Sequence, residues 1–452
     1  MLNIKQVETN YFKVIRKSLI ISRLKELGYE TPLEEINDLI RNKLELNLEF
    51  NRGDRASTHM REYEYLRRNY ILNTNCIWTT YVKLKDNNGF CIVSMEREEE
   101  KRQKETFGKL VISSITVSEN VTEELEFIQD GFSEKIKGIE AWVETNKVSE
   151  RFAELSENYT LPIFEEEDYS IAKKFANKNI NQTIQAVKAS GGMLRREVNV
   201  KTEKYGCTDE LLEQLIDLKL IKSEYVILCR KSSEQINRVP SKESIGVLKE
   251  HNIKCRCGKL ISDELIEEIL TTTDKANYMV DGSHWMTIAL VEAFLTLGVP
   301  KENILVNIYD GPEEIDAIVS YRGKLLLFEL KDSQFSMGHA YAFQSRLGLY
   351  TPTKGIIWAA GGVAPEVKEH YNRAKSDAEL YYIEKVEHLY EGLNALIQDI
   401  NWEFVESILQ PLHGASTFSF NIAGGILKEL QGNLTLPKEG KQVKEVVSSL
   451  KE

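Results

Sequence analysis

The hydrophobic positions are most densely arranged in two short runs in the C-terminal half of the chain. Ile315–Val319 is apolar except for one acidic residue, and Leu325–Phe328 is wholly apolar. Arg322 and Gly323 lie between the two runs, and glycine readily takes the positive φ that a tight hairpin turn needs. Near-continuous apolar runs of this length are typical of strands that are buried on both faces. The pattern therefore predicts a buried hairpin with a two-residue turn.

Helical periodicity flanks this hairpin on both sides. Asp281–Gly298 repeats apolar residues at helical spacing, and its final glycine is a natural C-terminal stop. A second helix is predicted over Ser333–Tyr350, and Lys354–Gly362 predicts a further buried strand that ends in a glycine turn. Beyond Tyr371 the pattern is largely helical. The C-terminal half is therefore expected to be an α/β arrangement.

The middle of the chain, from about residue 180 to residue 229, follows the order helix, helix, strand. Thr208 is a good N-cap for the second helix. This order and its leucine spacing resemble a winged helix, a fold that contacts DNA in many proteins and docks other proteins elsewhere. Both roles stay open at this point.

The first 120 residues are a mixed α/β region. Helices are expected over 11–24 and 32–46, a hairpin from the runs 78–84 and 90–95, and another strand over 109–117. Residues 50–70 interleave arginine and aromatic residues, which can stack bases and bind phosphates. The same pattern also fits a solvated amphipathic helix.

Composition indicates a soluble globular protein of two to four domains, with 452 residues, 42% hydrophobic and 28% charged. A membrane span needs ~18 apolar residues in a row, and neither such a run nor a signal-peptide pattern is present. Six largely unpatterned cysteines fit a reducing compartment. We therefore expect a cytoplasmic protein with no membrane partner. No glycine-rich phosphate loop supports a nucleotide-hydrolysing motor.

Charge is unevenly distributed along the chain. The net charge of −12 argues against a protein that coats nucleic acid, yet residues 181–260 hold 15 Lys and Arg against 10 Asp and Glu. A basic island in an acidic protein is where a nucleic-acid contact is expected. Arg195, Arg196, Lys201 and Lys204 are the predicted phosphate-binding residues.

The hairpin carries acidic residues at one end. With Arg322-Gly323 as the turn, Asp316 lies opposite Glu329, and Glu314 opposite Lys331. Opposed side chains are ~4.5–5.5 Å apart, so buried like charges repel unless a cation lies between them. Mg²⁺ prefers carboxylate oxygens, and a metal beside a lysine is the equipment that phosphodiester hydrolysis needs.

At these residues the chain resembles the PD-(D/E)XK, or restriction-endonuclease-like, nuclease superfamily. The pattern consists of E-I-D, an apolar strand, a short turn and a strand that ends in E-L-K. It is similar to the pattern in Holliday-junction resolvase-like, Mrr-type and CRISPR ancillary effector nuclease domains. The resemblance covers roughly 278–371. It implies metal ligation by Asp316, Glu329 and the main-chain carbonyl of Leu330, and catalysis with Lys331, using Mg²⁺ or Mn²⁺.

Three further residues are candidates for the same site. Glu314 lies next to the E-I-D pattern, and Gln344 lies on the helix after the lysine, where some family members place a polar group. The family often carries a glutamate in the first turns of the preceding helix. Thr287 stands about there in this sequence, and Glu292 follows more than a turn later. Either Glu292 replaces the usual glutamate, or the site lacks that ligand.

The cysteines of the central region suggest a second metal. Cys229 is followed by Cys255 and Cys257 in a pattern that looks like a degenerate zinc ribbon. Serine stands where one cysteine would belong. Three thiolates can bind one structural Zn²⁺ if Cys207, His251 or water completes the tetrahedron, and a ribbon without metal is the alternative.

We therefore expect five parts: 1–160, a mixed α/β region of unknown role with an acidic helical end; 161–228, winged-helix-like; 229–260, zinc-ribbon-like; 261–380, the nuclease domain; and 381–452, helical. The expected function is a metal-dependent nuclease, with DNA favoured over RNA, acting in phage defence, restriction or repair. The alternative is a nucleic-acid-binding or regulatory subunit with an inactive nuclease fold. A protein partner or a homo-oligomer fits either function.

Overall fold

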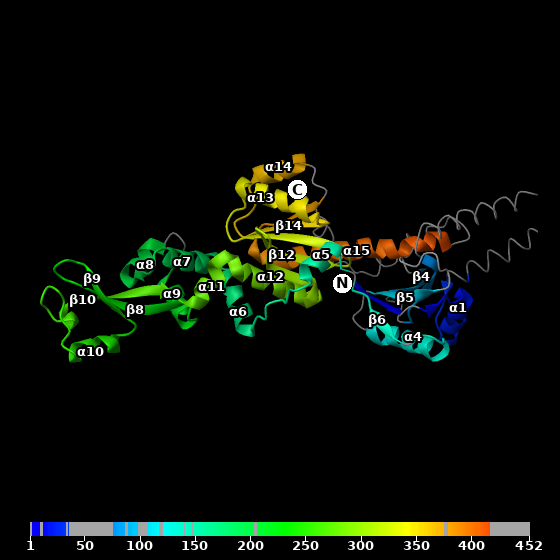
Figure 1. Cartoon of the computed structure of the whole chain (residues 1–452), viewed down its shortest axis with the longest axis horizontal. Coiled ribbons are helices and arrows are strands. Elements are labelled where there is room, and N and C mark those ends of the chain that lie inside the picture. The colour runs from blue at the N-terminus through cyan, green and yellow to red at the C-terminus, as the bar shows by residue number, and fades with distance from the viewer. Residues whose placement is uncertain are drawn as a thin grey trace, which may run out of the picture. The chain divides into compact units, whose positions relative to one another are not determined.

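The computed structural model describes residues 2–9, 12–32, 35, 76–85, 89–97, 107–116, 121–139, 141–146, 148–202, 206–374 and 378–415. These residues form a mixed α/β structure with three β-sheets (Figure 1). They divide into two compact units by their internal contacts. Unit 1 contains the described residues before 149, the turn Tyr321–Gly323 and the described residues from Asn394 onward, and unit 2 contains the rest.

Unit 1 is built on a six-stranded sheet with the order β3-β4-β5-β1-β6, in which β2 pairs with β5. Its apolar residues gather on both faces of the sheet, and helices cover each face. Cys91, Val93 and Ile112 pack with Leu24 of α1 and Phe132 of α4. Its elements are β1 (Asn3–Thr9), β2 (Phe12–Lys13), α1 (Lys17–Glu26), β3 (Cys76–Lys83), β4 (Gly89–Arg97), β5 (Phe107–Thr116), α4 (Val121–Lys135), β6 (Trp142–Glu144) and most of α15 (Leu389–Ala415).

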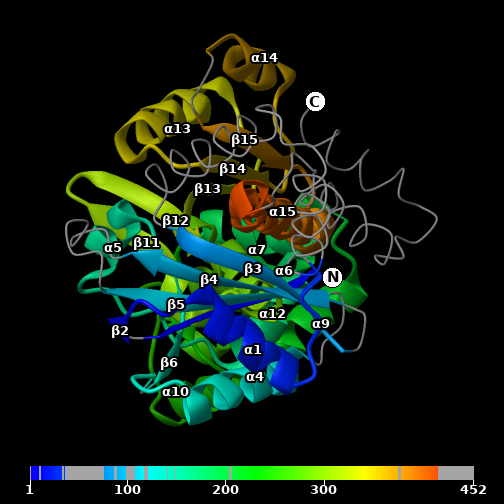
Figure 2. The ribbon, with the colours of Figure 1, turned by 90° about the vertical axis from the view of Figure 1, so that its right-hand side faces the viewer.

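The other face of this sheet is covered by α15. Phe90, Ile92 and Ile115 pack against Val405 and Leu409 of that helix. Figure 2 shows α1 and α4 together beside the sheet and α15 on its other side. The sheet is thus sandwiched between helices from the two ends of the sequence.

The predictions for unit 1 are confirmed in part. β3 and β4 pair as the expected antiparallel hairpin, and β5 matches the predicted strand. The helix expected over 11–24 begins only at Lys17, because the chain first forms β1 and β2. Most of the predicted helix 32–46, and the arginine- and aromatic-rich stretch 50–70, lie outside the described residues.

Unit 2 begins with helices that lead into a four-stranded sheet of order β7-β10-β8-β9. The side chain of Thr208 accepts a hydrogen bond from Leu211 N, which confirms it as the N-cap of α9. The elements are α5 (Glu150–Ser156), α6 (Glu166–Phe175), α7 (Lys178–Ala189), β7 (Met193–Leu194), α8 (Arg195–Thr202), α9 (Asp209–Asp217), β8 (Ile221–Leu228), β9 (Gln235–Val239), α10 (Lys242–Glu250), η3 (Ile261–Asp263), β10 (Leu265–Thr272) and α11 (Asp274–Val280).

A five-stranded sheet of order β11-β12-β13-β14-β15 completes unit 2. β11 and β12 are antiparallel, whereas β13, β14 and β15 are parallel. The elements are η4 (Asp281–Ser283), α12 (His284–Thr296), η5 (Lys301–Asn303), β11 (Ile304–Asp310), β12 (Glu313–Tyr321), β13 (Lys324–Lys331), α13 (Met337–Tyr350), β14 (Lys354–Ala359), α14 (Pro365–Ala374), β15 (Glu379–Ile383) and η6 (Val386–His388), followed by the start of α15.

The predicted hairpin is confirmed as β12 and β13. Arg322 and Gly323 are its two turn residues, with φ of 50° and 77°, which are the positive values of a type I′ turn. Gly298, with φ of 79°, follows the end of α12 as predicted.

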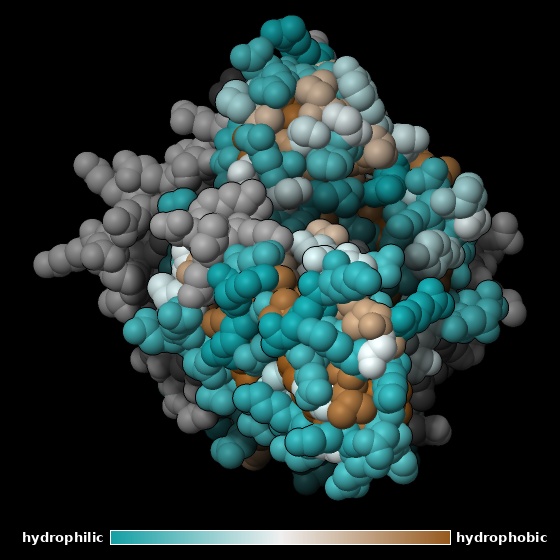
Figure 3. All heavy atoms as spheres, turned by 90° about the vertical axis from the view of Figure 1, so that its left-hand side faces the viewer, coloured by the Kyte–Doolittle hydropathy of each residue, from teal (hydrophilic) through white to brown (hydrophobic). Residues whose placement is uncertain are grey.

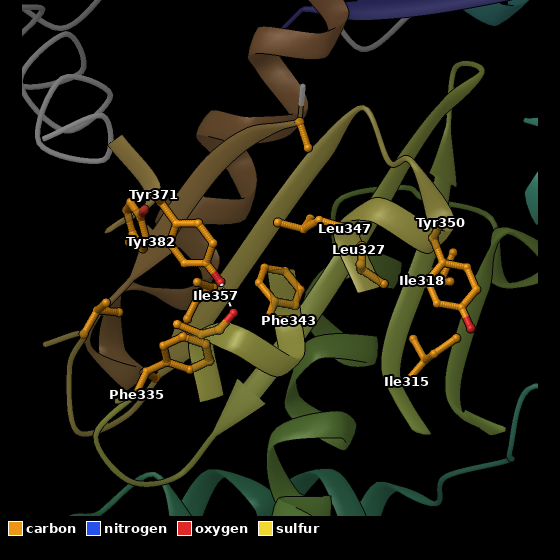
Figure 4. Close-up of a cluster of buried hydrophobic side chains, with 14 of the residues drawn as sticks. Ile315, Ile318, Leu327, Phe335, Phe343, Leu347, Tyr350, Ile357, Tyr371 and Tyr382 are labelled. Atoms are coloured by element: carbon orange, nitrogen blue, oxygen red, sulfur yellow. Dashed lines mark hydrogen bonds between the residues drawn. The ribbon is translucent and has the colours of Figure 1, made fainter. Parts of the chain in front are cut away.

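The two faces of the five-stranded sheet are covered by different helices. Leu327 of β13 packs with Phe343 and Leu347 of α13 (Figure 4). The next residue, Phe328, points the other way and meets the ring of Phe294 on α12, with centroids 5.4 Å apart. Because side chains alternate along a strand, Glu329 and Lys331 lie on the α13 face.

The units divide at 148–149, earlier than the boundary expected at 160, because α5 belongs to unit 2. The C-terminal helix is divided between the units rather than forming a region of its own. Within the described part of the chain, no helix combines the length and the apolar character that a bilayer span requires.

Candidate active site on β12 and β13

Asp316 of β12 and Glu329 of β13 form a buried acidic pair. Glu329 is only 3% exposed, and the side chain of Asp316 is 20% exposed. The carboxylate of Asp316 accepts a hydrogen bond of 2.7 Å from Leu330 N. β13 thus holds Asp316 through the main-chain N–H of Leu330, and it carries Glu329 as one of its own side chains.

Lys331 joins the two acids. Its Nζ lies 3.1 Å from Glu329 Oε1 and 3.9 Å from Asp316 Oδ2. Burial works against the charged ammonium, but the two carboxylates outweigh it, so the pKa of Lys331 is raised above its usual value. The lysine therefore carries its charge at neutral pH.

Arg346 of α13 is part of this site, and sequence reasoning missed it. Its guanidinium forms an ion pair with Glu329 Oε2 and lies 3.4 Å from Glu313 Oε2. Arg346 is three residues after Phe343 and four before Tyr350, both buried in the core. The helical spacing of that buried stripe is the sequence feature that could have placed it toward the sheet.

The electrostatic balance of the site is uneven. Glu329 contacts both cations, whereas the nearest cation to Asp316 is Lys331 at 3.9 Å. Burial, followed by repulsion from Glu329, raises the pKa of Asp316 to about 6, although Lys331, Leu330 N–H and Arg346 oppose the rise. An acid in a satisfied ion pair has a lowered pKa instead. The two nearby cations therefore do not offset the burial of Asp316 and its repulsion from Glu329.

The three additional candidates are placed differently. Glu314 is exposed and accepts a hydrogen bond from Tyr309 at 3.2 Å, so Glu313 takes the place near the site instead. Glu292 forms an ion pair of 2.7 Å with Lys173 of α6. Gln344 has a buried Oε1 for which the described residues provide no hydrogen-bond partner.

The first turns of α12 carry Thr287 rather than an acid. Its side chain is buried and lies 3.4 Å from Asn307 Oδ1 of β11. Among the described residues, its hydrogen-bond partner is Asn307 rather than either acid of the pair. The site is therefore built from β12, β13 and α13.

The predicted phosphate-binding arginines are already paired with carboxylates. Arg195 forms ion pairs with Glu213 and Glu268, and Arg196 Nη1 lies 3.4 Å from Glu267. Lys201 lies in α8, and Lys204 lies outside the described residues. The helix α9 adds further exposed acids, namely Asp209, Glu210, Glu213 and Asp217.

The predicted zinc ligands Cys229, Cys255 and Cys257 come together in space, and the fourth member of their cluster is Glu264. Neither of the protein residues proposed as the fourth ligand, Cys207 and His251, belongs to it. Sequence reasoning missed Glu264 because it searched for thiols and imidazoles.

Comparison with known proteins adds little. No protein-family model matches the chain, and no curated protein matches it. Among solved structures, the chain is similar to the crystal structure of protein VC1899 from Vibrio cholerae, with a TM-score of 0.26 and 12% identity over 60% of this chain and 59% of that one. A similarity of this size carries no argument about fold or activity.

Proposed function

We propose that unit 2 is a divalent-metal-dependent nuclease that hydrolyses phosphodiester bonds of nucleic acid, with DNA favoured as substrate. The observation that carries the proposal is the partly buried Asp316, which lies 3.9 Å from Lys331 and whose pKa is raised to about 6 by burial and by Glu329. A buried acid pair with too little positive charge, next to a lysine, suits a hard cation and a phosphate.

The donor set fits Mg²⁺ or Mn²⁺. Asp316, Glu329 and the main-chain carbonyl of Leu330 would hold the ion, since hard cations prefer oxygen ligands. When bound, it would polarise the phosphate and lower the pKa of a water molecule. Lys331 supplies a fixed positive charge at the same place, where it can orient that water and stabilise charge that develops on the phosphate.

Arg346 has two consequences for this chemistry. Its guanidinium forms an ion pair with one oxygen of Glu329, so a cation at that oxygen would have to compete with it. Once released from Glu329, the same planar group can pair with a phosphate through two parallel hydrogen bonds. We propose that it serves as a phosphate-binding residue.

The order of elements also supports the proposal. α12 precedes three antiparallel strands, and α13 follows them before the parallel strand β14. This order agrees with the resemblance to the restriction-endonuclease-like superfamily. We propose phage defence, restriction or repair as the setting, because that is where the resembling nucleases act.

For the central module we propose a winged-helix arrangement, supported by the order α7, β7, α8, α9, β8, with β10 following after β9, α10 and η3, and by the pairing of β7 with β10. The neutralised Arg195 and the exposed acids of α9 favour its use as a protein-docking module over a DNA-reading one. The second candidate function of this module is therefore to bind a partner protein or a second copy of the chain.

The proposal is tested by offering the full chain plasmid, linear duplex, single-stranded DNA and RNA with Mg²⁺ or Mn²⁺. Lys331→Ala should reduce cleavage by ~10²–10³, while Lys301→Ala, an exposed lysine in η5, should leave it unchanged. Equal rates for wild type and Lys331→Ala would reject the role of that lysine. Absence of cleavage of every substrate with either metal would favour the alternative, a regulatory subunit with an inactive nuclease fold.

A further inference from the structure

The end of unit 2 that carries β9 and α10 has almost no apolar core. Between residues 229 and 264 the buried residues are Cys229, Val239, Cys255, Ile261 and Glu264. The nine-residue helix α10 buries none of its residues. Figure 3 looks at this end and shows a mainly hydrophilic surface with small hydrophobic patches. Val247, Ile253 and Ile266 are exposed apolar residues of this region. Hydrophobic packing alone gives this segment little reason to hold one conformation.

Two tight turns bring three thiols together at its centre. In the first turn, Cys229 N donates to Glu234 O at 2.8 Å and Ser233 N donates to Cys229 O at 2.7 Å. In the second, Cys255 N donates to Lys259 O at 2.8 Å, and Cys257 N lies 3.5 Å from Cys255 Sγ. Main-chain N–H groups directed at a cysteine sulfur stabilise the thiolate form that binds metal.

Glu264 completes this group, and its carboxylate is 2% exposed. Arg230 N holds Oε2 at 2.7 Å, which leaves Oε1 facing the sulfurs, 2.8 Å from Cys257 Sγ. The guanidinium of Arg230 is directed elsewhere, with Nε 3.1 Å from Asp263 O. A buried carboxylate beside three thiols is a group that a cation can bind.

We propose that Cys229, Cys255, Cys257 and Glu264 bind one structural Zn²⁺. Their four ligand atoms all lie within 4.8 Å of one another. Tetrahedral zinc, with bonds of ~2.3 Å to sulfur and ~2.0–2.2 Å to oxygen, separates its ligands by roughly 3.5–3.8 Å, so small side-chain adjustments complete the site. Three thiolates select zinc over Mg²⁺, which keeps this site chemically separate from the acidic pair.

The zinc clamps the long connection between β8 and β10. Cys229 directly follows β8, and Glu264 directly precedes β10, while Cys255 and Cys257 lie on the turn after α10. One ion thus ties both ends of a 34-residue connection to its far turn, counted from 230 to 263. In a segment with so small a core, a structural metal replaces hydrophobic packing as the source of order.

The test is the metal content of the full chain purified without chelators. We expect one zinc per chain. Loss of a residue that only supports a metal ligand typically weakens metal binding ~10–100-fold, so Glu264→Gln, which removes a ligand itself, should weaken zinc binding by at least that factor. Asp263→Asn, which changes the neighbouring exposed carboxylate, should bind zinc as wild type does. Glu264→Cys should retain the ion, because it replaces one anionic ligand by another.

A measurement on wild type keeps the test decisive if Glu264→Gln does not fold. Zinc should protect Cys229, Cys255 and Cys257 from alkylation and slow hydrogen exchange over 229–264. Zinc-free protein that gains no such protection when zinc is added would overturn the site, as would a disulfide among these cysteines in its place. Equal zinc affinity of wild type and Glu264→Gln would remove Glu264 from the ligand set.

Discussion

Replacing Asp316 with asparagine should stabilise the metal-free protein at neutral pH while it abolishes cleavage. Asparagine keeps the size of the side chain, and its Oδ1 can still accept the hydrogen bond that Leu330 N donates to Asp316. It removes a buried negative charge that repels Glu329 and that burial disfavours. It also removes an oxygen ligand of the proposed metal site.

The pKa gives the magnitude. The carboxyl of Asp316 moves from an ordinary value of 3.8 to about 6 in the folded chain. Each unit corresponds to 1.36 kcal/mol, so ionised Asp316 costs the folded state about 3 kcal/mol at pH 7.5. A domain of this size shifts its melting temperature by roughly 2–4 °C per kcal/mol, so the variant should melt roughly 6–12 °C higher.

The sign of the pH dependence follows from proton binding. Between pH 3.8 and about 6 the folded chain holds a proton on Asp316 that the unfolded chain has released. Wild-type stability therefore falls as the pH rises through this window and levels off above it. Asparagine does not titrate, so the advantage of the variant should be near zero at pH 4 and full at pH 7.5.

Metal binding should remove this difference in stability between wild type and Asp316→Asn. Mg²⁺ at a hundred times its dissociation constant stabilises a binding protein by about 2.7 kcal/mol, which is close to the predicted cost of the charge. Wild type should gain this stability and Asp316→Asn should not. Calorimetry at pH 4 and pH 7.5, in EDTA and in Mg²⁺, gives the four values, and hydrogen exchange in peptides from 304–331 assigns the transition to unit 2.

Glu314→Gln is the matched control, since Glu314 is an exposed acid on the same strand and should change stability by less than about 0.5 kcal/mol. The opposite outcome is expected for Glu329→Gln, which removes the partner of both Lys331 and Arg346 and should destabilise. If Asp316→Asn is less stable than wild type at pH 7.5 in EDTA, the acid pair is a structural ion-pair network, and the metal reasoning fails.

The remaining predictions concern the same site. Arg346→Met should bind Mg²⁺ more tightly in titration calorimetry, because an oxygen of Glu329 is freed, while cleavage slows by ~10²–10³. Arg373→Met, which breaks an exposed pair with Glu369, should change neither the affinity nor the rate. Weaker Mg²⁺ binding by Arg346→Met would show that the arginine does not compete. Below pH 6 the apparent Mg²⁺ affinity should fall about tenfold per pH unit, as protons compete for Asp316, and a flat profile down to pH 5 would contradict this. EDTA should stop cleavage and added Mn²⁺ should restore it; activity that survives thorough chelation would rule out the metal mechanism.

The hairpin was predictable because its information is local. Two apolar runs and the Arg322-Gly323 turn fix where β12 and β13 begin and end. Cross-strand pairing in this hairpin then predicted that Asp316 lies close to Glu329 and Lys331. The N-cap at Thr208 and the stop at Gly298 were predictable for the same reason, because each acts on its own helix.

The residues that sequence reasoning missed depend on contacts between distant elements. Arg346 is 17 residues after Glu329, and its approach depends on how α13 packs on the sheet. Glu264 lies seven residues after Cys257, but only the folding of η3 returns it to the thiols. The sequence of β1 shows no clear strand pattern, and β1 forms a strand because it pairs with β5 on one side and β6 on the other. Glu313 rather than the predicted Glu314 lies near the site, which strict alternation from Asp316 along β12 does not predict.

The charge balance of the site is an argument for the proposed metal centre over a purely structural ion-pair network. Three carboxylates, on Asp316, Glu329 and Glu313, meet two cations, on Lys331 and Arg346. In a network that only stabilised the fold, each added cation would lower the pKa of the acid beside it. Here both cations lie closest to Glu329, and burial followed by repulsion from Glu329 keeps the pKa of Asp316 raised to about 6, although Lys331 and Arg346 lower it. Lys331 approaches Asp316 only to 3.9 Å. The divalent cation that we propose between the two acids would supply positive charge beside Asp316. A rearrangement of these side chains would not, because each cation that moves toward Asp316 leaves Glu329 buried with less compensation.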